Sequence, residues 1–192
     1  VEDAEPLATG SFEGGLPCAE VTFRTAAAEE SIRKMTDIYP DMLIGAGSTY
    51  DGAGRQGSSG RSKFIVSPGF DPEVVDYCIL KQIPVFPGCI DPSEVAQAVK
   101  EIEVVKFFPA VQFGGVSTIQ ALTAPYVGLK FMPTGGVNAK NLADYLQCKS
   151  IIACGGSWMV KSQYIHEHRF DKITRLTRQA VELVREIRRK RS

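Results

Sequence analysis

The 192-residue sequence lacks the features that mark several classes of protein. No two of its five cysteines form a C-x-x-C pair, and its two histidines lie near no carboxylate cluster, so neither a zinc site nor a disulfide framework is expected. The 22 basic and 22 acidic residues cancel, which argues against nucleic acid or an anionic membrane as a partner. No apolar run reaches the roughly 18 residues that a membrane span needs, and the first residues carry no signal-peptide pattern. We therefore expect one cytoplasmic domain, residues 1–192, that needs no metal.

Short apolar runs rich in β-branched residues alternate with helical patterns along the chain. The strand-like runs cover residues 18–24, 42–47, 63–69, 83–88, 103–109, 129–136 and 150–157. The expected helices cover residues 26–39, 72–81, 92–100, 115–124, 138–147 and 171–189. This alternation implies parallel strands with helical crossovers. Glycine-containing turns end four of the strands, which favours a (β/α)8 TIM barrel over an open doubly wound sheet. The eighth strand of such a barrel is expected before residue 1.

Local signals mark several element boundaries. Asp71 and Asp91 each precede a proline, a pattern that predicts an N-cap followed by the first helical residue. Residues 8–12 are expected to interrupt an otherwise helical start. Residues 49–62 are rich in glycine and serine and hold one large apolar side chain, so no helix there could bury a useful face. The basic run 188–191 is interpreted as offsetting a helix macrodipole rather than as a nucleic-acid-binding tail.

Polar side chains share one face of the strand expected at 18–24. Because successive strand residues point to opposite faces, Cys18, Glu20, Thr22 and Arg24 lie on one side and the apolar residues on the other. The apolar side would meet helices, which leaves the polar side lining the barrel interior. Buried charge is costly unless it is paired or used, so these two charges indicate either a functional site or a structural ion pair.

Lys106 stands within an apolar strand, near its C-terminal end. A lysine must be neutral to attack a carbonyl, and apolar surroundings favour the uncharged amine. Lys63 and Lys130 also lie in expected strands, but each stands at the start of its strand, on the opposite rim of a barrel. Position therefore selects Lys106 as the candidate Schiff-base lysine, with a structural lysine as the alternative.

Two glycine-rich turns end the last two expected strands. Pro133-Thr134-Gly135-Gly136 ends one, and Gly155-Gly156-Ser157 ends the other. Glycines let backbone N–H groups approach an anion closely, and turns at this place in a barrel commonly hold phosphate. The pair of turns therefore predicts a phosphate site, whereas either turn alone would indicate only a change of chain direction.

With these residues in hand, the chain resembles the 2-keto-3-deoxy-6-phosphogluconate (KDPG) and 4-hydroxy-2-oxoglutarate aldolase family. The matching segments occur in family order and at similar spacing from about residue 12 onward: AEVTFRT at 19–25, GAG at 45–47, IVSPGF at 65–70, PVFPG at 84–88, VVKFFPA at 104–110, PTGGVN at 133–138 and GGSW at 155–158. The combination of KFFPA, PTGG and GGSW is the most specific part of the resemblance.

The resemblance implies a role for each matched position. Lys106 would form the Schiff base, Glu20 would be the general acid/base, and Arg24 would bind the substrate carboxylate. Further substrate contacts are implied at Ser48, Pro68, Pro87, Phe108, Thr134, Gly135, Gly136, Gly155, Gly156 and Ser157; at Ser48 the family has a threonine. The family forms homotrimers of (β/α)8 barrels and uses no cofactor or metal. The implied reaction cleaves KDPG to pyruvate and glyceraldehyde 3-phosphate.

Some departures and alternatives stay open. The first strand and leading helix of the family are not found in this sequence. Residues 49–62 stand where the family has an amphipathic helix, which indicates either a reading-frame error in the coding sequence or a natural loop. An aldolase that prefers 4-hydroxy-2-oxoglutarate or the galactonate epimer would use the same residues. A barrel that only binds sugar phosphates is a further alternative, although it would have no reason to keep Lys106 together with Glu20 and Arg24.

Overall fold

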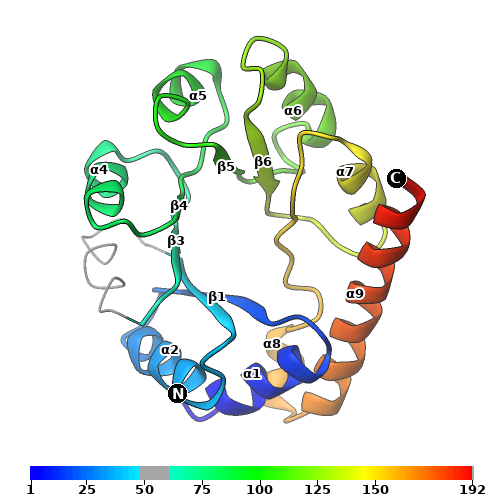
Figure 1. Ribbon diagram of the computed structural model, residues 1–192. Coiled ribbons are helices and arrows are strands. Elements are labelled where there is room, and N and C mark those ends of the chain that lie inside the picture. Colours follow the sequence, from blue (N-terminus) through cyan, green and yellow to red (C-terminus); the bar gives the residue numbers. More distant parts are fainter. Residues whose placement is uncertain (48–60, 192) are drawn as a thin grey trace. The chain divides into compact units, whose positions relative to one another are not determined.

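The computed structural model describes residues 1–47 and 61–191 (Figure 1). That part of the chain forms two compact units. Unit 1 contains Val1–Ser67, Asp71–Val85 and Met159–Val181. Unit 2 contains Pro68–Phe70, Phe86–Trp158 and Glu182–Ser192. Ser48 and most of the stretch 49–62 fall outside the described residues, so the expectations for them are not tested.

Helices and parallel strands alternate along the described chain, as the sequence predicts (Figure 1). The strands are β1 (Cys18–Thr22), β2 (Leu43–Gly47), β3 (Phe64–Val66), β4 (Val85–Phe86), β5 (Val104–Phe107) and β6 (Lys130–Pro133). The helices are α1 (Ala4–Glu13), α2 (Ala27–Ile38), α4 (Pro72–Leu80), α5 (Pro92–Ala98), α6 (Gly115–Thr123), α7 (Leu142–Gln147), α8 (Ser162–His166) and α9 (Phe170–Arg191). Helix α8 is not among the helices expected from the sequence.

In unit 1, strands β1, β2 and β3 run parallel, with Glu20 paired to Gly45 and Gly45 paired to Phe64. Gly45 is needed in this register, because a Cβ there would overlap the ring of Phe64. The fully buried side chains of Ile44 and Ile65 form the core between the strands and their helices. A residue without a side chain on the middle strand thus lets an aromatic ring of the neighbouring strand lie against the sheet.

The interruption of the helical start that was expected at residues 8–12 is wrong. Helix α1 continues without a break through this stretch. Gly10 would have poor helix propensity in isolation, but a Cβ there would lie only 3.3 Å from side-chain atoms of Ile173 and Thr174 on α9. Close packing of α1 against α9 therefore requires a small residue at this position, and tertiary contact overrides propensity.

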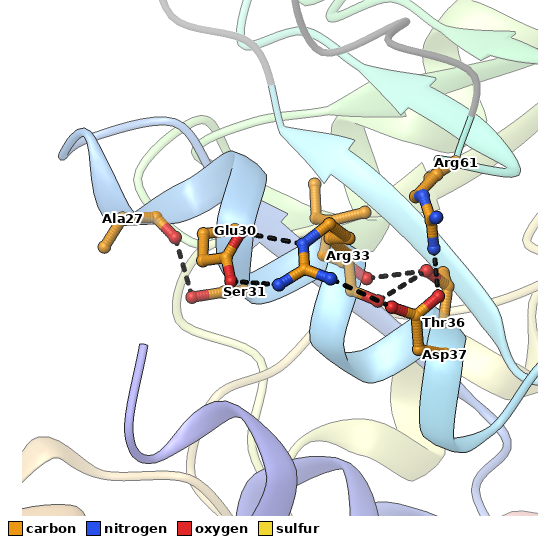
Figure 2. A network of polar contacts seen from close by, with 8 residues as sticks. Ala27, Glu30, Ser31, Arg33, Thr36, Asp37 and Arg61 are labelled. Atoms are coloured by element: carbon orange, nitrogen blue, oxygen red, sulfur yellow. Dashed lines mark hydrogen bonds and ion pairs between the residues drawn. The ribbon is translucent and has the colours of Figure 1, made fainter.

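Helix α2 carries a network of charged side chains on its exposed face (Figure 2). Arg33 donates to Glu30 one turn before it, and its other branch lies 3.2 Å from the Asp37 carboxylate. Arg61 pairs with the second oxygen of Asp37. Exposed ion pairs of this kind contribute little to stability, because solvent screens them. The buried positions Ile32 and Met35 hold α2 on unit 1 instead.

The two aspartate caps expected from the sequence are confirmed. The Asp71 side chain accepts hydrogen bonds from the first turn of α4, the Glu73 amide at 3.0 Å among them. The Asp91 side chain accepts from the Ser93 amide at 2.7 Å and the Glu94 amide at 2.9 Å at the start of α5. Each helix therefore begins at the residue that its Asp-Pro pair predicts.

In unit 2, strands β5 and β6 run parallel, with Lys106 paired to Met132. A seventh strand at 150–157 is wrong, since that segment forms only isolated bridges with residues 131 and 134. Its hydrogen bonds to β6 lie at either end, where the Phe131 amide donates to Ser150 and the Gly155 amide donates to Pro133. The ladder is interrupted between the bridge at Ile151 and the bridge at Gly155, before the two glycines are reached.

Helix α7 is shorter than the expected 138–147. The side-chain oxygen of Asn138 accepts a hydrogen bond from the Lys140 backbone amide at 2.9 Å. The backbone amide of Asn138 donates to the side-chain oxygen of Asn141 at 2.8 Å. Asparagine side chains that bond to nearby backbone compete with helix formation and favour turns. The helix consequently begins at Leu142, after this turn.

Helix α9 buries one stripe of side chains, Ile173, Thr177, Ala180 and Ile187 among them. At its basic end, Arg188 donates to the Ile152 carbonyl at 2.8 Å, and Arg191 donates to the Leu146 carbonyl at 2.8 Å. Two members of the basic run therefore have structural partners within unit 2. Among the described residues, no helix is long and apolar enough to cross a membrane.

Candidate active site

Lys106 is buried in unit 2, with 8% of its surface exposed, at the third of the four residues of β5. Its backbone is fixed from both sides, because its amide donates to the Pro87 carbonyl at 2.8 Å and its carbonyl accepts from the Cys89 amide at 2.8 Å. Val105 and Phe107, the flanking residues on the other face of the strand, are fully buried. A lysine held in these surroundings is a rare feature, since buried lysines are costly without a partner or a function.

The ring of Phe108 lies against the amine. Lys106 Nζ is 5.1 Å from the centre of this ring, within the range of a cation–π contact. The ring also borders Gly135, where an added Cβ would lie 3.1–3.2 Å from two ring carbons. The predicted lysine, the predicted substrate contact Phe108 and the first glycine of the turn therefore lie together in unit 2.

The other two strand lysines differ from Lys106 as the sequence predicts. Lys63 is exposed and precedes β3, and Lys130 is half-buried at the first residue of β6. The Lys130 amine lies 3.4 Å from the Lys149 carbonyl. Only Lys106 combines burial with a position near the C-terminal end of its strand among these three lysines.

Pro68 and Pro87, expected at the substrate pocket, belong to two loops that approach each other closely in unit 2. A Cβ added at Gly88 would overlap the Pro68 carbonyl, so the approach depends on glycine at 88. Pro87 is buried and supplies the carbonyl that accepts from Lys106, whereas Pro68 is exposed. Gly88 is a positioning residue that the sequence reasoning missed, and the repeated Pro-Gly turns were its only signal.

Glu20 lies on β1 in unit 1, with its carboxylate over Gly47 of the neighbouring strand. A Cβ at Gly47 would overlap Glu20 Oε1, which explains why the GAG segment ends in glycine. The expectation that Glu20 is buried is wrong: Glu20 is exposed, as are Thr22 and Arg24 on the same face of the strand. Val21 and Phe23 are half-buried, so the assignment of the two faces is right but the polar one meets solvent.

Cys18 shares the polar face of β1 and does not supply a nucleophile. Burial, and to a smaller extent the charge of the Glu20 carboxylate, raise the pKa of its thiol. Burial also raises the pKa of Cys89 and of Cys154 to about 12. These thiols therefore stay protonated at neutral pH, and a protonated thiol is a poor nucleophile and metal ligand.

The first glycine turn directly follows β6. Gly135 and Gly136 have positive φ angles of 91° and 82°, which L side chains rarely adopt. The Thr134 amide donates to the Phe107 carbonyl at 2.9 Å, and the Thr134 carbonyl accepts from the Ala110 amide at 2.8 Å. Thr134 Oγ1, by contrast, is buried without a hydrogen-bond partner among the described residues. A buried hydroxyl left in this state is costly, and a substrate oxygen could satisfy it.

The second glycine turn lies beside the first. Gly155 pairs with Thr134 in an isolated bridge, and a Cβ at Gly155 would overlap the Thr134 methyl group. A Cβ at Gly156 would overlap the ring of Trp158, while Ser157 is exposed. The two turns expected to hold phosphate are therefore neighbours in unit 2. Among residues 1–47 and 61–191, no group of three or more His, Cys, Asp or Glu side chains could hold a metal ion.

Comparisons with known proteins show the family of the chain. The KDPG and KHG aldolase family matches residues 1–176. A 2-dehydro-3-deoxy-phosphogluconate aldolase of Treponema pallidum is 43% identical over 187 residues, which cover 96% of this chain and 89% of that protein.

Two solved structures show the fold. A KDPG aldolase of Legionella pneumophila with pyruvate captured as a covalent carbinolamine intermediate has a TM-score of 0.88 and 34% identity, covering 93% of this chain and 87% of that one. A KDPG aldolase of Zymomonas mobilis with 3-phosphoglycerate has a TM-score of 0.86 and 30% identity, covering 93% and 85% of the two chains. The fold class expected from the sequence, a (β/α)8 TIM barrel, is confirmed by these neighbours.

Proposed function

The chain belongs to the KDPG and KHG aldolase family, and from this premise we propose that it is a class I aldolase that cleaves KDPG to pyruvate and glyceraldehyde 3-phosphate. The observation that carries the proposal is the position of Lys106, buried near the C-terminal end of β5 with the Phe108 ring beside its amine. The Legionella relative captures pyruvate covalently, and a buried strand lysine is the group of this chain that we assign to the same chemistry.

The proposed reaction begins at the Lys106 amine. The neutral amine adds to the C2 ketone of the substrate, and loss of water from the carbinolamine gives an iminium that withdraws electrons from C3. A base removes the proton of the C4 hydroxyl, the C3–C4 bond breaks, and glyceraldehyde 3-phosphate leaves. The electron pair of the broken bond forms an enamine, which takes a proton at C3. Water then hydrolyses the resulting iminium, releasing pyruvate and the free amine.

Glu20 is the proposed proton carrier, acting directly or through a water that it orients. Its carboxylate lies over Gly47 at the end of β2, so it is aimed by the strand pair rather than by a mobile loop. Because Glu20 is exposed, it can exchange protons with solvent between steps. Arg24 follows β1 and is proposed to bind the substrate carboxylate, a task suited to a guanidinium fork. Ser48, outside the described residues, is proposed to contact pyruvate through its hydroxyl.

The phosphate group is proposed to bind at the two glycine turns. In the described part of the chain, no backbone carbonyl accepts a hydrogen bond from the amides of Gly135, Gly136, Gly156 and Ser157. Backbone N–H groups in such turns form concave sites that favour anions. The Thr134 hydroxyl, buried without a partner among the described residues, is available to a substrate oxygen. This cradle supports a phosphorylated substrate over unphosphorylated 4-hydroxy-2-oxoglutarate.

The Schiff base can be tested by reduction. We expect incubation with pyruvate and borohydride to add a stable adduct on Lys106, located by mass spectrometry of the proteolysed protein. Lys106→Ala should abolish both the adduct and turnover. Lys130→Ala is the matched control, since it removes a lysine from the strand that pairs with β5 but at the opposite end. An adduct that survives Lys106→Ala would refute the assignment, and no adduct on the native chain would favour a barrel that only binds sugar phosphates.

The substrate can be tested with a pyruvate-release assay on KDPG, its galactonate epimer and 4-hydroxy-2-oxoglutarate. We expect kcat/KM to be largest for KDPG.

The proposed single-domain aldolase would assemble as a homotrimer, which light scattering can measure. We place it in a reducing, cytoplasmic compartment, because its five cysteines are all free thiols.

A further inference from the structure

We infer that the Phe108 ring is a positioning residue for Lys106 and that Gly135 fixes the ring, so that the first glycine turn sets the geometry of the amine as well as binding phosphate. The inference rests on the proposed function and deepens it. It makes one prediction that phosphate binding alone does not: a change at Gly135 should disturb the reaction of pyruvate, a ligand without a phosphate.

The contact between the ring and the amine forms where β5 ends. Lys106 is the third residue of the strand, and Phe108 is the first residue of the turn that follows Phe107. The ring centre lies 5.1 Å from Lys106 Nζ. The face of an aromatic ring attracts a cation at this range, and it does so for the ammonium and for the iminium that replaces it. The ring thus holds the nitrogen in its charged states, as the resting ammonium and again as the iminium.

The position of the ring is set by the turn. The Gly135 backbone has a φ of +91°, and the nearest atoms to a Cβ built there are Pro109 Cα at 3.0 Å and two carbons of the Phe108 ring at 3.1 and 3.2 Å. These separations are shorter than ordinary van der Waals contact, so any side chain at 135 would push the ring aside by a few tenths of an ångström. Gly135 thus does two things: it leaves room for the Phe108 ring, and it adopts the positive φ that the turn needs.

The consequence is a mechanical connection across β5 and β6. The Thr134 amide bonds to the Phe107 carbonyl at 2.9 Å, which ties the start of the turn to the strand that carries Lys106. The backbone of β5 is fixed by this bond and the Phe108 ring lies against the amine, so the Lys106 side chain can move little. Reaction rates are sensitive to such placement, with losses of up to about 10²-fold for a displacement of about 1 Å.

The experiment measures the rate of borohydride trapping with pyruvate, in single variants and in a double-mutant cycle. We expect Gly135→Ala to slow trapping by roughly 3- to 10-fold, since the ring moves by less than the distance that costs about 10²-fold. Gly128→Ala is the matched control: Gly128 has a φ of +94° and nothing within 4 Å of its Cβ position. It carries the same backbone strain without touching the ring, and trapping should match that of the native chain.

The cycle identifies the ring as the carrier of the effect. Phe108→Leu should slow trapping by roughly tenfold, and Phe108→Tyr should recover most of the rate because it keeps the ring. In the Phe108→Leu background, Gly135→Ala should change trapping by less than about twofold, since the group that it displaces is gone. If Gly135→Ala prevents folding, the Phe108→Leu and Phe108→Tyr variants still test whether the ring positions the amine.

Three results would overturn the inference. Normal trapping in Gly135→Ala, with only the KM for KDPG raised, would mean that the turn serves phosphate alone. An undiminished effect of Gly135→Ala in the Phe108→Leu background would assign it to the backbone at Pro109. Equal trapping by Phe108→Leu and Phe108→Tyr would mean that the ring has no role. Failure of the native chain to trap pyruvate is a different outcome, because it refutes the proposed function itself and the inference with it.

Discussion

Thr177 on α9 offers a direct test of the packing in unit 1. The residue is 1% exposed, and its hydroxyl oxygen is buried without a hydrogen-bond partner among the described residues. Its carbon atoms pack against Gly14 at the end of α1, where an added Cβ would lie 2.6 Å from them. Valine has nearly the same shape, so Thr177→Val should keep this packing and remove the isolated hydroxyl.

The expected gain follows from the cost of an unsatisfied polar group. An unpaired buried hydroxyl costs about 1–3 kcal/mol, so Thr177→Val should raise the free energy of unfolding by about that amount. For a chain of this length each kcal/mol corresponds to about 2–4 °C in Tm. Differential scanning calorimetry and urea unfolding would measure both quantities.

The matched control for Thr177→Val lies one turn earlier on the same helix. Thr174 donates to the Phe170 carbonyl at 3.1 Å, so Thr174→Val removes a satisfied hydroxyl and should give no gain in stability. A fall in Tm for Thr177→Val would refute the reasoning, because it would mean that the Thr177 hydroxyl is satisfied in solution.

Two other changes test the caps and the thiols. Asp91→Ala should lower the free energy of unfolding by about 1 kcal/mol, measured by urea unfolding, whereas Asp91→Asn should lose less because its side chain can still cap α5. Cys89 and Cys154 should resist iodoacetamide at pH 8 in the folded protein, because burial raises the pKa of each thiol to about 12; rapid alkylation of either would contradict this. A folded pKa above the ordinary 9.0 contributes stability below about pH 9, and that stability should decline as the pH rises toward 12.

Much of the fold follows from local sequence signals. Six of the seven expected strands and all six expected helices are present in the described chain, because alternating apolar patterns and caps such as Asp71 act within one element. One error, at Gly10, comes from a contact between segments distant in the sequence, and another, the late start of α7, comes from the local turn at Asn138. Gly10 has poor helix propensity, but close packing against α9 needs a small residue there. The segment 150–157 has a strand-like pattern, but it forms only two isolated bridges.

Some features of the candidate site could be predicted from the sequence and others could not. Lys106 could be chosen from the sequence as the candidate Schiff-base lysine, because its place near the C-terminal end of an apolar strand decides which rim of the barrel it faces. The exposure of Glu20 could not, since strand alternation assigns a side chain to a face but does not say what covers that face. The roles of Gly47 and Gly88 could not be predicted for a related reason, because they depend on the Glu20 carboxylate and the Pro68 carbonyl that occupy the space beside them.

The arginines at the end of α9 do more than carry positive charge, because they also donate hydrogen bonds to backbone carbonyls. Arg191 reaches two main-chain oxygens where α7 ends, those of Leu146 at 2.8 Å and Cys148 at 3.4 Å. Both bonds are donated by one guanidinium nitrogen, Nη1, whose two N–H groups serve the two oxygens. Trimming these residues as a dispensable tail would therefore leave the last carbonyls of a distant helix open to water.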